Sequence, residues 1–335
     1  MIDKSKLLIK FDEKPAKNFG IYPEERKLEE LFDKGMINID KDAGPTSHQV
    51  VDMLKKVLKI EKAGHSGTLD PKVTGVLLCG LGRATRLMEY MLKSNKEYVC
   101  LMYLHKQVEE EKIRDVVKKF TGEIMQTPPL VSAVKRQERP RTIYKNEILS
   151  IKGQYVLLRV ACQHGTYMRK LCSDMGEDLG VTAQMVELRR TKAGPITENE
   201  NIVSLDKLRN FYELYLNSDN LEEKNIFYNE LIKFIQPMEV MLKDFKKVYV
   251  RNSAVGSLTY GSDLAIPGVS MLDEGIEMGE EIALMTLKGE LIAMGTAFLS
   301  SKDVMKKDKG AFIKTSKVFM DREYYPKQWD FNFEY

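Results

Sequence analysis

The 335-residue sequence is poor in the residues that build metal centres and disulfide frameworks. It has only four cysteines, four histidines and one tryptophan, and no two cysteines form a CxxC pair. This spacing argues against a disulfide scaffold and against a zinc ribbon. Cys162, His164 and Cys172 lack the close second pair that a tetrahedral metal site requires. We therefore expect neither a metal ion nor a cofactor.

Long apolar runs and a charge excess of one sign are also missing. No apolar run approaches the ~18 residues of a membrane span, and the charged N-terminus has no signal-type apolar stretch behind it. We expect a cytoplasmic protein without a membrane partner. Lys and Arg number 52 against 49 Asp and Glu, so the net charge of +3 gives no sign of nucleic-acid binding. A total charge nevertheless hides how charge is distributed.

A hydrophobic fraction of 43% and a charged fraction of 30% are typical of a globular protein, and the length allows about two domains. Apolar periodicity predicts strands over 97–104, 155–162 and 185–190, and helices over 108–120 and 167–179. It also predicts a helix that carries apolar residues from 50 to 58, with Thr46 and Ser47 as N-cap hydroxyls. The stretch from 127 to 145 reads as a loop or hairpin because of its prolines. The pattern predicts a mixed, largely antiparallel α+β sheet flanked by helices, followed by a smaller β-rich domain.

The peptide GHSGTLDP at 64–71 carries the strongest chemical signal. Its glycines permit backbone turns that other residues resist, and Pro71 keeps Asp70 out of the helical region. A carboxylate presented on such a loop is a candidate nucleophile or base. The alternative is an ordinary turn in which the aspartate hydrogen-bonds its own backbone.

This peptide resembles the catalytic motif of TruB-type pseudouridine synthases, in which the aspartate attacks the target uridine. KEY at 96–98, GTYMR at 165–169 and VELRRT at 186–191 resemble further motifs of that family in the same order. The resemblance implies that Asp70 is the nucleophile, Arg169 pairs with it, Tyr98 stacks on the uracil and Leu188 closes the apolar side. It also implies that His65 flanks the stack vacated by a flipped base, the alternative being a histidine that only caps a turn.

The proline-containing stretch from 128 to 144 is similar to the thumb loop of dyskerin-type enzymes, which modify RNA under the direction of box H/ACA guide RNAs. Between 135 and 145 stand five basic residues against one acidic residue, and phosphate contacts dominate RNA affinity. The candidate RNA-binding residues are Lys135, Arg136, Arg139, Arg141 and Lys145. A solvated loop is the alternative.

The β-rich C-terminal part resembles a PUA domain, a small β-barrel found on RNA-modifying enzymes. Six lysines against two aspartates lie between 302 and 317, and Lys306, Lys307, Lys309 and Lys314 are candidate RNA contacts. The resemblance implies an N-terminal arm over 1–35 that packs on the PUA domain. It also implies a catalytic domain over 36–245 with a thumb loop at about 127–146, and a PUA domain with its tail over 246–335.

The resemblance implies several partners: a box H/ACA guide RNA, a ribosomal or transfer RNA substrate, a small zinc-ribbon-like Nop-type subunit, a Gar-type subunit and a kink-turn-binding protein. Three alternatives stay open. The first is a stand-alone synthase for the T-loop of transfer RNA, which would read the folded shape of its substrate. The others are a non-catalytic RNA scaffold and a glycosidase, although the sequence offers no second carboxylate to pair with Asp70.

Overall fold

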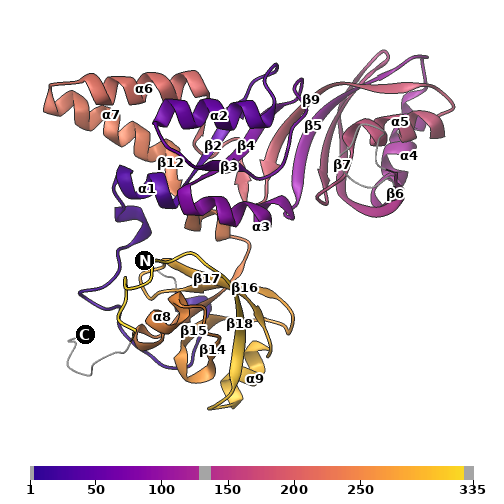
Figure 1. The fold of residues 1–335 in the computed structure, drawn as a ribbon. Coiled ribbons are helices and arrows are strands. Elements are labelled where there is room, and N and C mark those ends of the chain that lie inside the picture. Colours follow the sequence, from indigo (N-terminus) through magenta and orange to yellow (C-terminus); the bar gives the residue numbers. More distant parts are fainter. Residues whose placement is uncertain (1–3, 128–136, 328–335) are drawn as a thin grey trace. The chain divides into compact units, whose positions relative to one another are not determined.

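The computed structural model describes residues 4–127 and 137–327 and divides the chain into two compact units. We call residues 35–235 the central unit, and residues 1–34 together with 236–335 the terminal unit. Figure 1 shows the elements of both. The terminal unit begins again at Gln236, ahead of the boundary near 245 expected from the sequence. Residues 128–136 of the expected thumb loop, including Lys135 and Arg136, lie outside the described residues.

The central unit combines helices with one large sheet. Its helices are α2 (Ser47–Leu58), α3 (Met88–Leu92), α4 (Glu110–Lys119), α5 (Met168–Asp178), α6 (Leu205–Asn217) and α7 (Leu221–Phe234). Its strands are β2 (Gly35–Lys41), β3 (Ala63–His65), β4 (Thr74–Leu81), β5 (Lys96–Leu104), β6 (Gly122–Gln126), β7 (Arg139–Lys152), β8 (Tyr155–Cys162), β9 (Ala183–Ala193), β10 (Ile196–Thr197) and β11 (Ile202–Val203). Strand β12 (Ile235–Pro237) contains the boundary.

The sheet of the central unit is mixed, with the strand order β11-β2-β4-β9-β5-β8-β7-β6. Most neighbouring strands run antiparallel, whereas β4 runs parallel to β9 and β11 runs parallel to β2. Strand β4 is buried along nearly its whole length, as expected for an apolar strand that is covered on both faces. The predicted mixed, largely antiparallel α+β fold is confirmed.

Helix α2 starts where its sequence predicts. Thr46 accepts a hydrogen bond from the Gln49 amide at 3.2 Å, and the Gln49 side chain accepts one from the Thr46 amide at 2.8 Å. This capping box satisfies two backbone donors at the helix N-terminus. Leu54 and Leu58 recur at helical spacing and are fully buried. The start of the helix is thereby fixed, and with it the position of Ser47.

Strand β5 sets the geometry of the pocket described below. It pairs antiparallel with β8 on one side and with β9 on the other. The register places Tyr98 opposite Arg190, and Cys100 opposite Leu188. Because side chains two residues apart share a face of a sheet, Tyr98, Arg190 and Leu188 belong to the same face.

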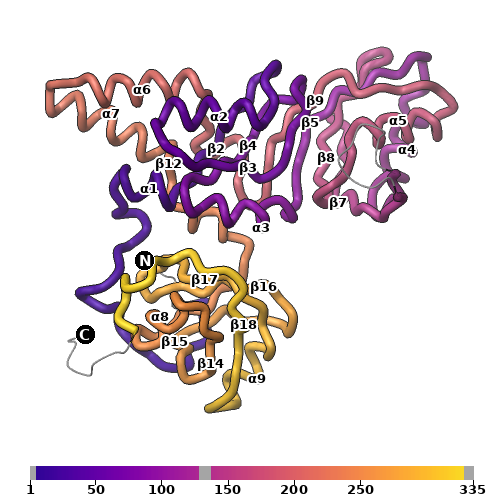
Figure 2. The backbone as a smooth tube through the Cα atoms, viewed as in Figure 1, coloured from indigo at the N-terminus to yellow at the C-terminus, as the bar shows by residue number. Residues whose placement is uncertain are grey.

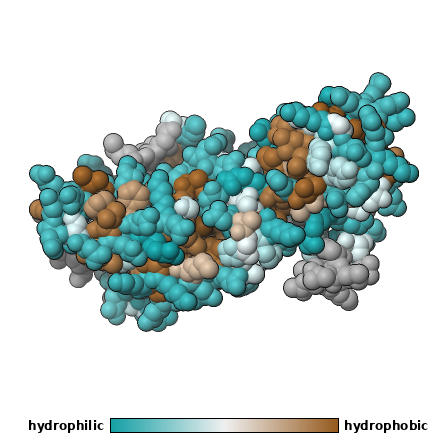
Figure 3. Space-filling model, turned by 90° about the horizontal axis from the view of Figure 1, so that it is seen from above, coloured by the Kyte–Doolittle hydropathy of each residue, from teal (hydrophilic) through white to brown (hydrophobic). Residues whose placement is uncertain are grey.

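Helices α6 and α7 form a hairpin, which the tube in Figure 2 traces. Aromatic rings pack between them, among them Tyr215 and Tyr228 with centroids 6.1 Å apart. Apolar side chains also face outward, since Leu221 is 73% and Ile226 59% exposed, and Figure 3 shows apolar surface at this end. Residues 196–230 carry eight acidic against three basic residues. The hairpin therefore presents an apolar and acidic surface, unlike one that binds phosphate.

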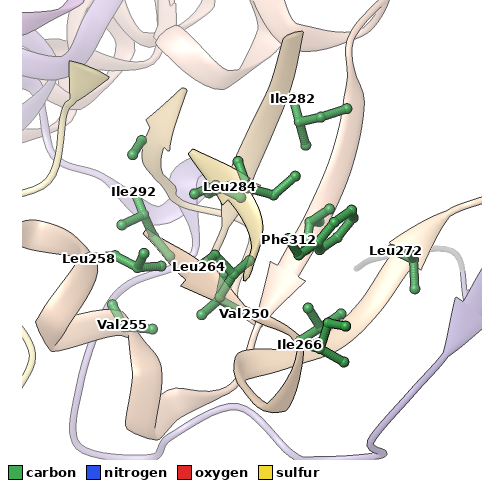
Figure 4. Close-up of a cluster of buried hydrophobic side chains, with 14 of the residues drawn as sticks. Val250, Val255, Leu258, Leu264, Ile266, Leu272, Ile282, Leu284, Ile292 and Phe312 are labelled. Carbon is green, nitrogen blue, oxygen red and sulfur yellow. The ribbon is translucent and has the colours of Figure 1, made fainter. Parts of the chain in front are cut away.

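The terminal unit contains a second sheet. Its helices are α1 (Leu28–Lys34), α8 (Asn252–Thr259) and α9 (Ser301–Lys306). Its strands are β1 (Leu7–Ile9), β13 (Lys246–Val250), β14 (Leu264–Ala265), β15 (Val269–Asp273), β16 (Glu281–Met285), β17 (Leu291–Ala297) and β18 (Ala311–Val318). They follow the order β1-β15-β13-β16-β17-β18-β14. Figure 4 shows the apolar core, where Val250, Leu284, Ile292 and Phe312 are fully buried.

The N-terminal segment contributes to this second sheet. Strand β1 pairs antiparallel with β15, with Leu8 opposite Leu272. Glu13 then accepts hydrogen bonds from Arg251 at 3.0 Å and from the Asn252 side chain at 2.8 Å. The segment also forms helix α1, which the sequence reading as an extended arm did not anticipate.

Candidate active site

The loop that carries Asp70 is held from two sides. The Ser47 hydroxyl accepts a hydrogen bond from the Leu69 amide at 2.8 Å and donates one to the Leu69 carbonyl at 3.2 Å. From β2, the ammonium of Lys41 donates to the Pro71 carbonyl at 3.1 Å. These contacts fix the backbone on both sides of Asp70, so its carboxylate is presented from a defined position.

Asp70 and Arg169 form an ion pair. An Arg169 guanidinium nitrogen lies 3.1 Å from an Asp70 carboxylate oxygen, and Arg169 belongs to the first turn of α5. The side chains of Asp70 and Arg169 are 50% and 53% exposed, so the pair is open to water. Exposed ion pairs contribute little to folding stability. This one is better explained by the pocket beside it.

A pocket of about 390 Å³ brings together four residues that the sequence singled out. Asp70 from the loop, Tyr98 from β5, Arg169 from α5 and Leu188 from β9 all line it. Its volume lies in the usual range for pockets that hold small ligands. One wall is therefore apolar and aromatic, and another carries the ion pair.

Two buried basic side chains line the same pocket. Lys96 donates to the Met91 carbonyl at 3.0 Å, and burial lowers the pKa of Lys96 to about 7. Arg190 is only 1% exposed and donates to backbone carbonyls. Together with Arg169 and His164, the lining has four basic side chains against the single carboxylate of Asp70. This imbalance suits a ligand that carries or develops negative charge.

His65, the last residue of β3, lies outside the lining of the pocket. Its ring meets the edge of His48, with centroids 4.9 Å apart, and its Nδ1 accepts a hydrogen bond from the Gly67 amide at 3.3 Å. Burial, with smaller contributions from the charges of His48 and Arg190, lowers the pKa of His65 to about 4. The imidazole is therefore neutral near pH 7 and acts as a packing ring.

Sequence reasoning missed the roles of Ser47, Lys41 and His164. The hydroxyls of Thr46 and Ser47 both suit a cap of α2, yet only Thr46 caps it while Ser47 binds the loop. The spacing of Cys162, His164 and Cys172 argues against a metal site and indicates no other role for His164, but His164 lines the pocket, and burial lowers its pKa.

The candidate RNA-binding residues near the pocket differ in their surroundings. Arg141 donates to the carbonyl of Gly165, a pocket residue, at 3.2 Å, so it lies at the rim. Arg139 is the first residue of β7. Lys145 instead forms an ion pair with Glu147 at 2.7 Å. Arg141 is thus the member of this group that the structure brings to the pocket.

The candidate lysines of the terminal unit lie along α9 and the start of β18. All four of them, Lys306, Lys307, Lys309 and Lys314, are exposed. Lys307 also accepts a hydrogen bond on its carbonyl from Lys10 at 2.8 Å. These side chains form a basic surface on that unit.

Comparisons with known protein families match nearly the whole chain. Residues 55–168 match the N-terminal domain of TruB family pseudouridylate synthases, and residues 169–243 match the C-terminal domain of tRNA pseudouridylate synthase B. Residues 246–319 match the PUA domain, and residues 1–51 match the DKCLD (NUC011) domain.

Similar proteins extend the match to full length. The chain is 47% identical to a probable tRNA pseudouridine synthase B of Pyrococcus furiosus, over 98% of this chain and 94% of that protein. A protein of the same description from Methanothermobacter thermautotrophicus is also 47% identical, over 93% and 94%. Among solved structures, a chain of a Cbf5-Nop10-Gar1 complex matches with a TM-score of 0.89 and 46% identity, over 96% of both chains. A chain of an H/ACA RNP bound to a substrate RNA containing 2′-deoxyuridine matches with a TM-score of 0.88 and 44% identity, over 96% and 97%.

The fold and the pocket define an RNA-modifying isomerase with an appended PUA domain. The chain belongs to the TruB family of pseudouridine synthases. Within residues 4–127 and 137–327, no helix is long and apolar enough to cross a membrane. The same residues contain no group of three or more His, Cys, Asp or Glu placed to hold a metal ion.

Proposed function

We propose that this chain is the catalytic subunit of a box H/ACA ribonucleoprotein and isomerises uridine to pseudouridine in ribosomal RNA at positions chosen by a guide RNA. One observation carries the proposal. The Asp70–Arg169 ion pair borders a pocket lined by Tyr98 and Leu188, in a chain that matches an RNA-bound H/ACA protein over 96% of its length.

The chemistry explains why these residue types are needed together. Isomerisation breaks the N1–C1′ bond, turns the base and forms a C5–C1′ bond, without oxidation and without a group donor. Asp70 supplies the carboxylate that attacks, and Arg169 holds that carboxylate toward the substrate. Tyr98 stacks on the uracil and Leu188 closes the apolar side, so the detached base stays in the pocket.

The target uridine must leave its stack in RNA before it can reach Asp70, at a cost of a few kcal/mol. Arg141, which contacts the pocket residue Gly165, would hold a phosphate next to the flipped nucleotide, with Lys135, Arg136, Arg139 and Lys145 as further proposed contacts. His65 flanks the vacated stack with a neutral ring. The charge of the five basic residues supports their proposed contacts with phosphate.

The rest of the chain serves the guide RNA in this proposal. Residues 36–245 are the catalytic domain, residues 246–335 are the PUA domain with its tail, and residues 1–35 are an arm on the PUA domain. Lys306, Lys307, Lys309 and Lys314 would grip the guide through its phosphates. The particle acts in the cytoplasm and needs no cofactor.

The proposed protein partners follow the solved complexes that this chain resembles. Those structures are a Cbf5-Nop10-Gar1 complex and an archaeal box H/ACA Nop10-Cbf5 complex. We accordingly propose a Nop-type and a Gar-type subunit as direct partners. A kink-turn-binding protein would join through the guide RNA.

A stand-alone transfer RNA synthase is the second candidate. The description of the relatives as probable tRNA pseudouridine synthases favours it. The two candidates differ in the source of specificity, which is base pairing with a guide in one and the folded shape of the substrate in the other.

Reconstitution separates the two candidates. The full chain with its Nop-type and Gar-type partners is incubated with RNA tritiated at uridine C5, with and without a guide, because isomerisation releases the C5 hydrogen. Tritium release from a ribosomal target should require the matching guide. Equal release without any guide, or release from transfer RNA alone, would contradict the guided function.

A further inference from the structure

Two adjacent arginines on β9 have opposite environments. Arg189 forms ion pairs with Asp40 at 2.9 Å and with Glu198 at 2.7 Å, and its side chain is 36% exposed. Arg190 points to the other face, as neighbours on a strand do, and is 1% exposed. In the part of the chain that the structure describes, no carboxylate forms an ion pair with Arg190.

The known partners of Arg190 are neutral. Its Nε donates to the Val76 carbonyl at 2.7 Å, and one terminal nitrogen donates to the Gly67 carbonyl at 3.3 Å. A guanidinium does not lose its proton in proteins, and burying a charge without a counterion is costly. A neutral side chain could donate hydrogen bonds to these two carbonyls equally well. The charge of Arg190 therefore calls for an explanation beyond folding.

The sheet register offers an explanation for the buried charge of Arg190. It places Arg190 directly opposite Tyr98 across β5 and β9. Arg190 and Tyr98 therefore share one face of the sheet, and both line the pocket. Burial raises the pKa of Tyr98, and the nearby charge of Arg190 opposes that rise. The phenol proposed to stack on the base thus has a permanent cation as its cross-strand neighbour.

We infer that Arg190 is a positioning residue of the reaction: it aims the Tyr98 hydroxyl into the pocket and stabilises negative charge on the tyrosine oxygen during proton transfer. The inference rests on the proposed function. Arg169 and Arg190 then divide the work, since Arg169 serves the carboxylate of Asp70 and Arg190 serves the phenol of Tyr98.

The proton transfers of the isomerisation explain how the positive charge of Arg190 would assist the reaction. One proton leaves C5 and one ends on N1. When the N1–C1′ bond breaks, the Tyr98 hydroxyl gives its proton to N1; after the C5–C1′ bond has formed, the tyrosine oxygen takes the C5 proton and is restored. Between the two transfers the oxygen is negatively charged. A buried, preorganised cation is the group that stabilises such a charge most strongly.

The test is a double-mutant cycle in the reconstituted, guide-bound particle. Arg190→Gln, Tyr98→Phe and the double variant are compared by single-turnover rate with saturating substrate RNA. Arg190→Gln should slow the rate about 100-fold, in the range for losing one preorganised donor. In the Tyr98→Phe background, the same change should slow the rate less than about 3-fold, because the oxygen it serves is gone.

Arg189→Gln is the matched control, since it removes a neighbouring guanidinium from the opposite face of β9. It should leave the single-turnover rate within about 3-fold of the wild type. Substrate RNA affinity and the thermal midpoint are measured for every variant, because a purely structural role would appear there. If Arg190→Gln does not fold, Arg190→Lys, which keeps the charge, replaces it, with an expected loss of about 10-fold that again vanishes with Tyr98→Phe.

Two results would overturn the inference: an Arg190 variant as active as the Arg189 control, or the same fold-loss with and without the Tyr98→Phe substitution. A wild-type particle that fails to form pseudouridine on a guided target contradicts the proposed function instead. The two failures are therefore distinguishable in one set of reactions.

Discussion

Two buried arginines, one in each unit of the molecule, show how differently the chain treats charge. In the terminal unit, Arg26 forms two hydrogen bonds with the carboxylate of Glu239, at 2.7 and 2.8 Å. Burial alone would lower the pKa of Arg26, but Glu239 and the nearby Glu290 raise it overall. In the central unit, Arg190 has no such carboxylate among the described residues and faces the pocket.

The same contrast separates the two ion pairs. The side chains of Arg26 and Glu239 are 3% and 9% exposed, whereas those of Asp70 and Arg169 are half exposed. Removing one partner of a buried ion pair leaves a buried charge uncompensated and strongly destabilises the fold. Breaking an exposed ion pair changes the stability of the fold little. We therefore expect charge in the terminal unit to matter for stability and charge around the pocket to matter for chemistry.

The largest expected effect is on chemistry alone. Asp70→Asn should reduce single-turnover pseudouridine formation by at least about 10⁴-fold, because the amide removes the attacking carboxylate. Substrate RNA affinity should change less than about 3-fold, since phosphate contacts dominate it. Rates and filter-binding affinities of the reconstituted particle measure both. Retained turnover would refute Asp70 as the nucleophile.

The second effect is on stability alone. Arg26→Met should lower the free energy of unfolding by about 3–5 kcal/mol, because it leaves the Glu239 carboxylate buried without a partner. Denaturant unfolding measures the loss. Arg209→Ala, which breaks an exposed pair with Asp206, is the control and should change stability by less than about 0.5 kcal/mol. Equal effects of the two variants would erase the contrast between buried and exposed pairs.

The third effect is again on chemistry, although the variant, like Arg26→Met, breaks an ion pair. Arg169→Gln should slow single turnover about 100-fold while lowering the free energy of unfolding by less than about 1 kcal/mol. Parallel rate and denaturation measurements on the same preparation check it. A large stability loss with unchanged turnover would assign Arg169 a structural role.

The smallest effect concerns pH. The pKa of His65 is about 4 in the fold, below its ordinary value of 6.5, so the unfolded chain binds more protons between these values. The contribution of His65 to stability should be complete above about pH 6.5 and fall by up to about 1 kcal/mol per pH unit toward pH 4. Denaturation from pH 4.5 to 7.5 should show this slope in the wild type and a shallower one in His65→Gln. Identical slopes would count against a half-buried neutral imidazole at position 65.

Much of the fold follows from local sequence. The alternation of apolar residues predicts β8 at 155–162, and the apolar spacing from 50 to 58 predicts α2, because both patterns record burial on one face. The reading of 127–145 as a loop or hairpin agrees with the antiparallel pairing of the consecutive strands β6 and β7, in which Gln126 lies opposite Arg139. The length of β7, which continues to Lys152 because it also pairs with β8, was not predicted from the local sequence.

The candidate site also contains residues that the sequence predicts and residues that it does not. Motif spacing points to Asp70, Tyr98, Arg169 and Leu188, and one pocket brings them together. The roles of Ser47, Lys41 and Arg190 could not be found by spacing, because they depend on contacts with residues distant in the sequence; these three residues are held by such contacts. Burial of a charge without a counterion is visible only in three dimensions.

The central claim is that a guide RNA, and not the protein, chooses the uridine that Asp70 attacks. Its most direct test is to redesign the pairing arms of the guide so that they expose a different uridine of the same ribosomal RNA, and to map pseudouridine along that RNA. Our account predicts that modification moves to the new position and is absent from both positions in Asp70→Asn. Modification that stays at the original uridine with the redesigned guide would contradict it.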